Sequence, residues 1–316
     1  FTAIGAMFLA WVFARMSMLV KAPGGPYAYA QAGFGKFIGF QMAFYYWFAL
    51  WVGNAAIAVA LVSYLHILFP ALANPEIRTI SAIIVVWILT LINCWGVEEA
   101  GIVQVICTIL KLIPIILIAI LGWFYFKSTN LTSTPNLTNG SDMSVFTAGV
   151  SLTLWAFIGV ESATVPSDRV INPRRNIPMA TLLGTLLAAI VYVSSSIAIS
   201  GMIPDKILAN SFSPFADAAA IIFGQWGKIF IGIGAIISCF GALNGWTLLV
   251  GQVGKSASKI GFFPKIMAKE SKRGAPVISL VISALLITLI LLSTLNKGLV
   301  EQFNLIILMA VIGSLV

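Results

Sequence analysis

The chain consists largely of apolar segments that are each long enough to cross a lipid bilayer. A spanning helix needs about 20 mostly apolar residues. Of the 316 residues, 60% are hydrophobic and only 9% are charged, against about 25% charged in ordinary soluble domains. The sequence therefore predicts an all-α, polytopic membrane protein that forms one transmembrane domain over 1–316. The predicted spans are 1–19, 37–66, 78–97, 102–126, 145–165, 179–203, 217–254 and 277–295, with a partial span at 303–316.

The run 217–254 is too long for a helix perpendicular to the membrane. A hydrophobic stretch longer than the hydrocarbon thickness must tilt, bend or begin outside the bilayer. We therefore expect one of these three departures within 217–254.

The basic residues are concentrated in alternate loops. The net charge is +8, and most Lys and Arg residues fall in the connectors 20–36, 166–178 and 255–276. This positive-inside bias predicts that these three loops are cytoplasmic and that the chain is a multi-pass protein of the cell (inner) membrane. It also accounts for the charge without a nucleic-acid partner.

No catalytic or metal-binding pattern is present in the sequence. The three cysteines lie inside apolar runs and lack metal or redox spacing. There is no nucleotide-binding loop and no Ser/His/Asp grouping that spacing supports. We therefore expect neither an enzyme nor a bound cofactor or metal.

Two charged residues of opposite sign fall well inside predicted spans, namely Glu161 and Lys111. An unpaired charge there costs about 2.5–3.5 kcal/mol on insertion scales, so such residues usually mark a pathway or a ligand site. Glu161 is either a neutral carboxyl group bonded to a neighbouring helix, or a proton carrier or anchor for a cationic substrate. Lys111 is either a structural lysine at a helix break or a participant in proton or ion coupling. Burial favours the uncharged form of both groups.

Four further residues could face a ligand. Trp155 and Trp246 lie well inside their runs, and each is either a core residue or a ring whose face holds a cation. Asn54 is an intramembrane amide that either bridges helices or binds a substrate head group. Gly159 lies two residues before Glu161 and can let the backbone open and release its NH and CO groups for binding. Together these residues favour a membrane transporter.

Five motifs in order along the chain resemble the amino acid–polyamine–organocation (APC) superfamily. Within it the chain is similar to the basic amino acid/polyamine antiporters, which include the bacterial arginine/agmatine antiporters. The resemblance covers essentially the whole sequence. The motifs are residues 23–30 (PGGPYAYA), 45–47 (YYW) with Gly53-Asn54, 154–162 (LWAFIGVES), 172–178 (NPRRNIP) and 245–248 (GWTL).

The resemblance implies a leucine-transporter-type fold with two inverted five-helix repeats and a broken sixth helix. The spans then correspond to helices two to early ten of an expected twelve, so the chain is expected to be a fragment truncated at both ends. By position, Trp155 resembles the gating aromatic of the sixth helix. Asn54 and Trp246 resemble substrate contacts, and Glu161 resembles the carboxylate implicated in proton-linked antiport.

Five positions depart from the arginine/agmatine pattern, among them Ala310 and Val311, which stand where that pattern has serines. Ala156 stands where that pattern has serine, and Ile57 stands where it has methionine. Lys111 is similar instead to a lysine of proton-coupled, sodium-independent members of the superfamily. These differences argue against arginine selectivity and favour sodium independence.

The resulting expectation is a sodium-independent secondary amino acid transporter. We expect an antiporter that exchanges a cationic amino acid for a related amine or amino acid, with proton coupling through Glu161 and Lys111. The alternatives are a neutral amino acid/proton symporter and a non-transporting amino acid sensor. The expected partners are a small amino acid or amine and the lipid bilayer. A disulfide-linked heavy chain is not expected because residues 67–77 contain no cysteine, and a homodimer stays open.

Overall fold

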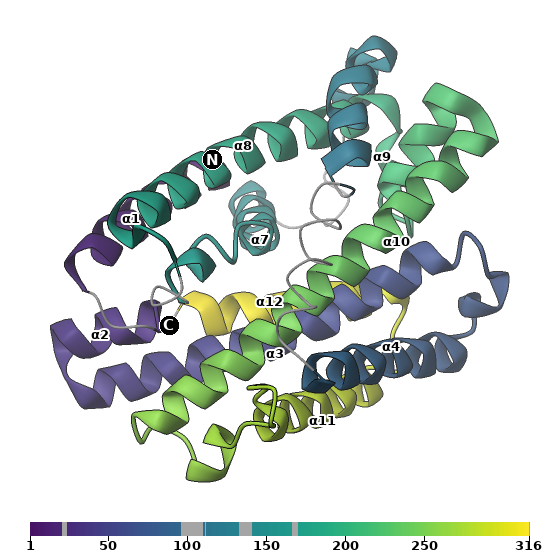
Figure 1. Ribbon diagram of the computed structural model, residues 1–316. Helices are drawn as coiled ribbons and strands as arrows, with labels where there is room; N and C mark the ends of the chain where they lie inside the picture. Colours follow the sequence, from purple (N-terminus) through teal and green to yellow (C-terminus); the bar gives the residue numbers. More distant parts are fainter. Residues whose placement is uncertain (21–23, 96–109, 111, 133–140, 166–169, 316) are drawn as a thin grey trace.

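The computed structural model describes residues 1–20, 24–95, 110, 112–132, 141–165 and 170–315, which form helices and connecting turns without a strand among them. Figure 1 shows long helices crossing one another in a bundle. Short 3-10 helices connect some of them: η1 (Pro70–Ala73), η2 (Gly122–Tyr125), η3 (Ser162–Thr164) and η5 (Lys265–Ala268). The α-helices are α1 (Thr2–Leu19), α2 (Pro26–Phe34), α3 (Lys36–Leu65), α4 (Pro75–Trp95), α6 (Ser128–Thr132), α7 (Asp142–Trp155), α8 (Pro173–Met202), α9 (Asp205–Leu208), α10 (Pro214–Lys259), α11 (Val277–Ser293) and α12 (Leu299–Leu315).

Several helices begin where the local sequence supplies a cap. The Asn74 side chain accepts hydrogen bonds from the backbone NH groups of Glu76 (2.8 Å) and Ile77 (3.3 Å) at the start of α4. Ser141 accepts one from Ser144 N at the start of α7. Proline occupies the first turn of α2, α8 and α10. Such residues satisfy or remove the free NH groups of a first turn, so the sequence itself fixes where these helices begin.

The outer helices are apolar on the faces that they turn away from the bundle. Within the described ranges, α1, α3, α4, α8 and α10 are long and apolar enough to cross a membrane. Phe8 and Trp11 of α1 and Leu187 of α8 are all more than 60% exposed. Exposed apolar surface of this extent is typical of a protein surrounded by lipid, in agreement with the predicted polytopic fold.

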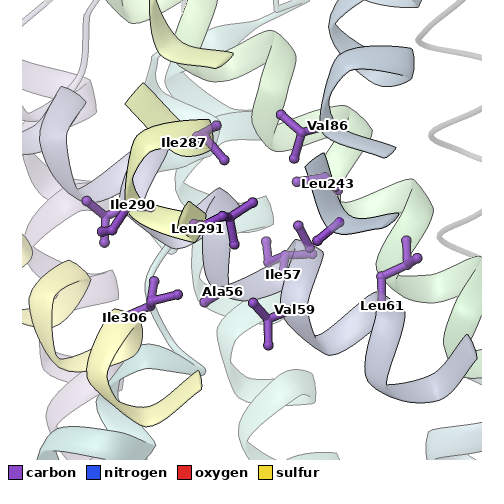
Figure 2. Packing of buried hydrophobic residues seen from close by; sticks show 14 of the residues in the cluster. Ala56, Ile57, Val59, Leu61, Val86, Leu243, Ile287, Ile290, Leu291 and Ile306 are labelled. Atoms are coloured by element: carbon purple, nitrogen blue, oxygen red, sulfur yellow. The ribbon is translucent and has the colours of Figure 1, made fainter. Parts of the chain in front are cut away.

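The centre of the bundle is α3. In its most apolar stretch 72% of the residues are buried, against 17% in α1. It packs against α2, α10 and α12, whereas α1 packs against α8 and α4 against α11 (Figure 1). Figure 2 shows the largest cluster of buried side chains, where Ile57 of α3 lies among Val86, Leu243, Leu291 and Ile306 from four other helices. Because this core holds α3 in one orientation, it also determines which α3 side chains reach the candidate site.

The helix α10 bends at Gly224, which has φ +72° and ψ −165°. Residues with a side chain avoid this backbone conformation, so glycine is needed there. A salt bridge from Lys228 Nζ to Asp217 Oδ1 (2.8 Å) spans the bend. We expected the run 217–254 to bend, tilt or begin outside the bilayer, and the structure shows a bend.

Most predicted spans match helices to within a few residues. The span 145–165 is interrupted because α7 ends at Trp155, in agreement with the expected break in the sixth helix. One correction concerns the connector 20–36, which is not entirely loop because it contains α2. For the predicted span 102–126, residues 102–109 and 111 lie outside the described residues, and the described residues 112–125 are helical.

Replacing Gly201 by Ala near the end of α8 should destabilise the protein. A Cβ atom there would lie 2.1 Å from Phe126 Cδ2, and the Phe126 ring is itself stacked on Trp123. Overpacking of this kind costs about 1–3 kcal/mol, which exceeds the gain of roughly 1 kcal/mol from alanine in a helix. A lower apparent melting temperature in detergent would verify it.

The matched control is Gly184→Ala in the same helix. No heavy atom of the described residues lies within 4 Å of a Cβ built there, so this variant should melt at the parent temperature or slightly above. Equal behaviour of the two variants would contradict the predicted packing.

Candidate functional site

The backbone after α7 is broken over residues 156–161. Helical bonding ends at Trp155, and tighter i to i−3 bonds follow from Ala156 N to Thr153 O (3.2 Å) and from Ile158 N to Trp155 O (3.1 Å). Gly159 then adopts φ +109°, a conformation that residues with a side chain rarely enter. The opening expected at Gly159 is therefore present, and the non-helical segment begins three residues earlier, at Ala156.

Glu161 folds back over this break and is 7% exposed. One carboxyl oxygen, Oε2, accepts a hydrogen bond from Gly159 N at 3.0 Å. The other, Oε1, has no hydrogen-bond partner among the described residues. A buried oxygen without a partner is costly, so this atom is available for a proton or for a donor on a ligand.

The buried side chain of Tyr46 in α3 lies beside this carboxyl group. Its hydroxyl interacts with Glu161, although neither Tyr46 Oη nor Glu161 Oε1 makes a hydrogen bond of good geometry within the described residues. Tyr46 was not among the predicted site residues. Its position offered a signal, because it precedes Gly53 and Asn54 by two helical turns and so shares their face of α3.

The two predicted tryptophans come close to the break from different helices. The Trp246 ring of α10 packs on Gly159, where a Cβ atom would lie 2.7 Å from Cζ2 and 2.8 Å from Cη2. Trp155 Nε1 lies 3.8 Å from a Cβ built at Gly53 of α3. The Trp155 ring also meets Phe303 of α12 edge to face at 5.7 Å. Helices α3, α7, α10 and α12 therefore meet around the broken segment.

Asn54 and Ile57 lie on the buried side of α3 that faces this meeting point. Asn54 is 1% exposed, and neither its Oδ1 nor its Nδ2 atom has a partner among the described residues. Of the two roles predicted for Asn54, a bridge between helices is therefore not observed within the described part of the chain. Ile57 belongs to the apolar core, where it contacts the same cluster as Trp155 and Trp246.

A cavity of about 220 Å³ lies on the other side of the break, against α8. Ala156 and Gly159 line it, but Asn54, Ile57 and Trp246 do not. The predicted site residues thus divide between the two sides of the segment 156–160. The remaining lining residues are Phe157, Ile158, Val160, Ala180, Thr181, Gly184, Thr185, Ala188 and Tyr192.

Lys111, the other predicted coupling residue, lies outside the described residues. The described part of the chain contains no group of three or more His, Cys, Asp or Glu side chains that could hold a metal ion.

Comparison with known proteins shows where the chain belongs. It is 38% identical to the "Cadaverine/lysine antiporter" of Escherichia coli K12 over 297 residues, which are 93% of the chain and 67% of that protein. It is 36% identical to the "Putrescine transporter PotE" of the same organism and 35% identical to that of Haemophilus influenzae. Both of these alignments cover the whole chain and 72% of the relative. The profile of the family described as "Amino acid permease" matches residues 1–316, and the chain therefore belongs to this family of membrane transporters.

Proposed function

We propose that the protein is a sodium-independent antiporter that exchanges a cationic amino acid for a related amine at the broken segment 156–161. The observation that carries the proposal is the buried Glu161 carboxyl group, whose Oε1 atom has no hydrogen-bond partner among the described residues. A protonated amine would satisfy that oxygen with a charge-assisted hydrogen bond, which is stronger than a neutral one. The names of the relatives, a cadaverine/lysine antiporter and a putrescine transporter, agree with such a substrate.

The neighbouring rings suit the same class of ligand. Trp155 and Trp246 are partly buried at the break, and a tryptophan face attracts an ammonium group by about 0.5–2 kcal/mol. The amide of Asn54, which has no partner among the residues that the structure describes, offers both a donor and an acceptor. In this proposal the carboxylate holds the cation, the rings cover its alkyl chain and the amide binds a polar end group.

Proton linkage follows from the same carboxyl group. When Glu161 is protonated it loses the charge that attracts an ammonium ion, so proton binding and cation binding compete for one side chain. Tyr46 lies close enough to donate a hydrogen bond to the charged form. The coupling role of Lys111 stays a prediction from the sequence.

Counterflow measurements test this function. Purified protein is reconstituted into vesicles that are preloaded with cadaverine, putrescine, agmatine, lysine, ornithine, arginine or leucine, and uptake of labelled lysine and of labelled putrescine is followed. We expect uptake to depend on an internal cation and to be unchanged when choline replaces sodium. Uptake of labelled leucine driven by an inward proton gradient, without uptake of lysine or putrescine, would support the neutral amino acid/proton symporter. Saturable binding without flux would support a sensor.

A further inference from the structure

A buried pair of amide side chains joins α4 to α10 close to the candidate site. Asn93 in the last turn of α4 is fully buried, and Asn244 of α10 is 2% exposed. Asn93 Nδ2 donates one hydrogen bond to Asn244 Oδ1 and another to Leu89 O of its own helix, both at 2.8 Å. The two donor hydrogens of Asn93 are thus used, and one of them reaches across the helix interface.

The surroundings of this pair are apolar. Leu89, Val86 and Leu243 belong to the main core cluster, and Figure 2 shows Val86 and Leu243 on facing helices. A hydrogen bond in such surroundings is strengthened by the low local dielectric. Removing one partner leaves the other buried and unsatisfied, which destabilises the packed helices. The pair therefore resists rotation or sliding of α10 against α4 more than apolar contacts alone would.

Helical geometry connects this pair to Trp246. Trp246 follows Asn244 by two residues, which is about 200° around an α-helix at 3.6 residues per turn. The two side chains therefore leave α10 on nearly opposite faces, Asn244 toward α4 and Trp246 toward Gly159. A rotation of α10 that broke the hydrogen bond between Asn93 and Asn244 would also move the Trp246 ring away from Gly159.

We propose that Asn93 and Asn244 are positioning residues that fix the rotational setting of α10 and so hold the Trp246 ring against Gly159. Their importance for exchange rests on the proposed function, whereas their effect on the ring does not. Polar pairs in apolar interfaces have this role elsewhere, where a single buried amide fixes the register of packed helices. Through this hydrogen bond, α4 acts on the position of the Trp246 ring.

The ring position can be measured without transport. The protein is labelled with 5-fluorotryptophan, and the ¹⁹F resonance of Trp246 is assigned by its loss in Trp246→Phe. We expect this resonance to shift or broaden in Asn93→Leu, in Asn244→Leu and in the double variant. The matched control is Thr90→Val in α4, because the Thr90 hydroxyl donates to Val86 O of its own helix and makes no other hydrogen bond within the described residues. An unchanged Trp246 resonance in all three variants would overturn the proposal.

Measurements of exchange and of thermal stability on the same variants distinguish a positioning role of the amide pair from a general contribution to the stability of the fold. Each single variant should raise the concentration of external lysine or putrescine that gives half-maximal exchange by about five- to tenfold, the factor expected for one hydrogen bond. The double Leu variant removes both polar groups, so its melting temperature should return toward the parent value. Its half-maximal concentration should stay raised, because apolar contact does not fix the rotation.

Two further outcomes separate the positioning role of Asn93 and Asn244 from the proposed function of the protein. Recovery of both stability and half-maximal concentration in the double variant would reduce the pair to a structural contact and overturn the positioning role. If the parent exchanges neither substrate while the ¹⁹F shifts occur as expected, the proposed function fails and the positioning of Trp246 stands.

Discussion

Exchange by the Glu161→Gln protein is expected to lose its dependence on pH. In the parent, affinity for a cationic substrate should fall as the pH falls, because protons compete with the substrate for the carboxylate. Glutamine keeps the shape but not the charge and cannot titrate. Loss of a hydrogen bond to a charged group should weaken cation binding at neutral pH on the order of 10- to 100-fold. Half-saturation constants measured over a pH series would show both effects.

Glu301→Gln provides the matched control for this experiment. Glu301 lies in the first turn of α12, and its side chain is 62% exposed where it pairs with Lys297. Exposed pairs contribute little, so this variant should keep the parent pH profile. If Glu161→Gln also kept that profile, Glu161 would have no part in proton linkage, and its carboxyl group would be a structural element of the break.

Replacing Gly159 by Ala is expected to reduce exchange more than tenfold. The new methyl group would lie 2.7 Å from the Trp246 ring, and the φ of +109° is strained for any residue with a side chain. Such strain costs about 1–3 kcal/mol, and relief of it would move either the ring or the broken segment. Initial rates of counterflow, normalised to the amount of folded protein in the vesicles, give the measure.

Gly149→Ala in α7 separates this effect from a general intolerance of the helix. A Cβ atom at Gly149 has no neighbour within 4 Å in the described part of the chain, so the exchange rate of this variant should equal that of the parent. Equal rates for the two alanine variants would show that neither the backbone at 159 nor its contact with Trp246 matters for transport.

Much of the fold could be predicted because the bilayer imposes a length and a polarity on each span. The predicted run 37–66 became α3 and the run 277–295 became α11 almost unchanged. Helix α2 was missed because prolines and glycines in 20–36 favour turns, whereas Pro26 actually occupies its first turn. The break within 145–165 was expected at Gly159, whereas its start at Ala156 was not, because residues 156–158 are as apolar as a helix would be and only backbone geometry marks the boundary.

Some residues of the candidate site could also be predicted from the sequence, whereas others could not. Glu161, Asn54 and Gly159 stand out from the sequence because a carboxylate, an amide and a glycine are unusual within apolar spans. Tyr46 is less distinctive because α3 contains many aromatic residues. Its spacing places it on the face of Gly53 and Asn54, but only the fold shows which ring reaches Glu161. The Asn93–Asn244 bond joins residues that are 151 positions apart. No local pattern predicts such a pairing, because it depends on how two helices cross.

The burial of α3 has a consequence for attempts to retune substrate preference. Tyr46, Asn54 and Ile57 lie on the helix that also forms the centre of the core. In random libraries at these positions, most substitutions would impair membrane insertion and lower the protein yield. Most variants would therefore be lost before their substrate recognition could be assayed. Redesign should therefore begin at Ala156 and at the small residues of α8 around Gly184, where empty volume can accept larger groups without dismantling the scaffold.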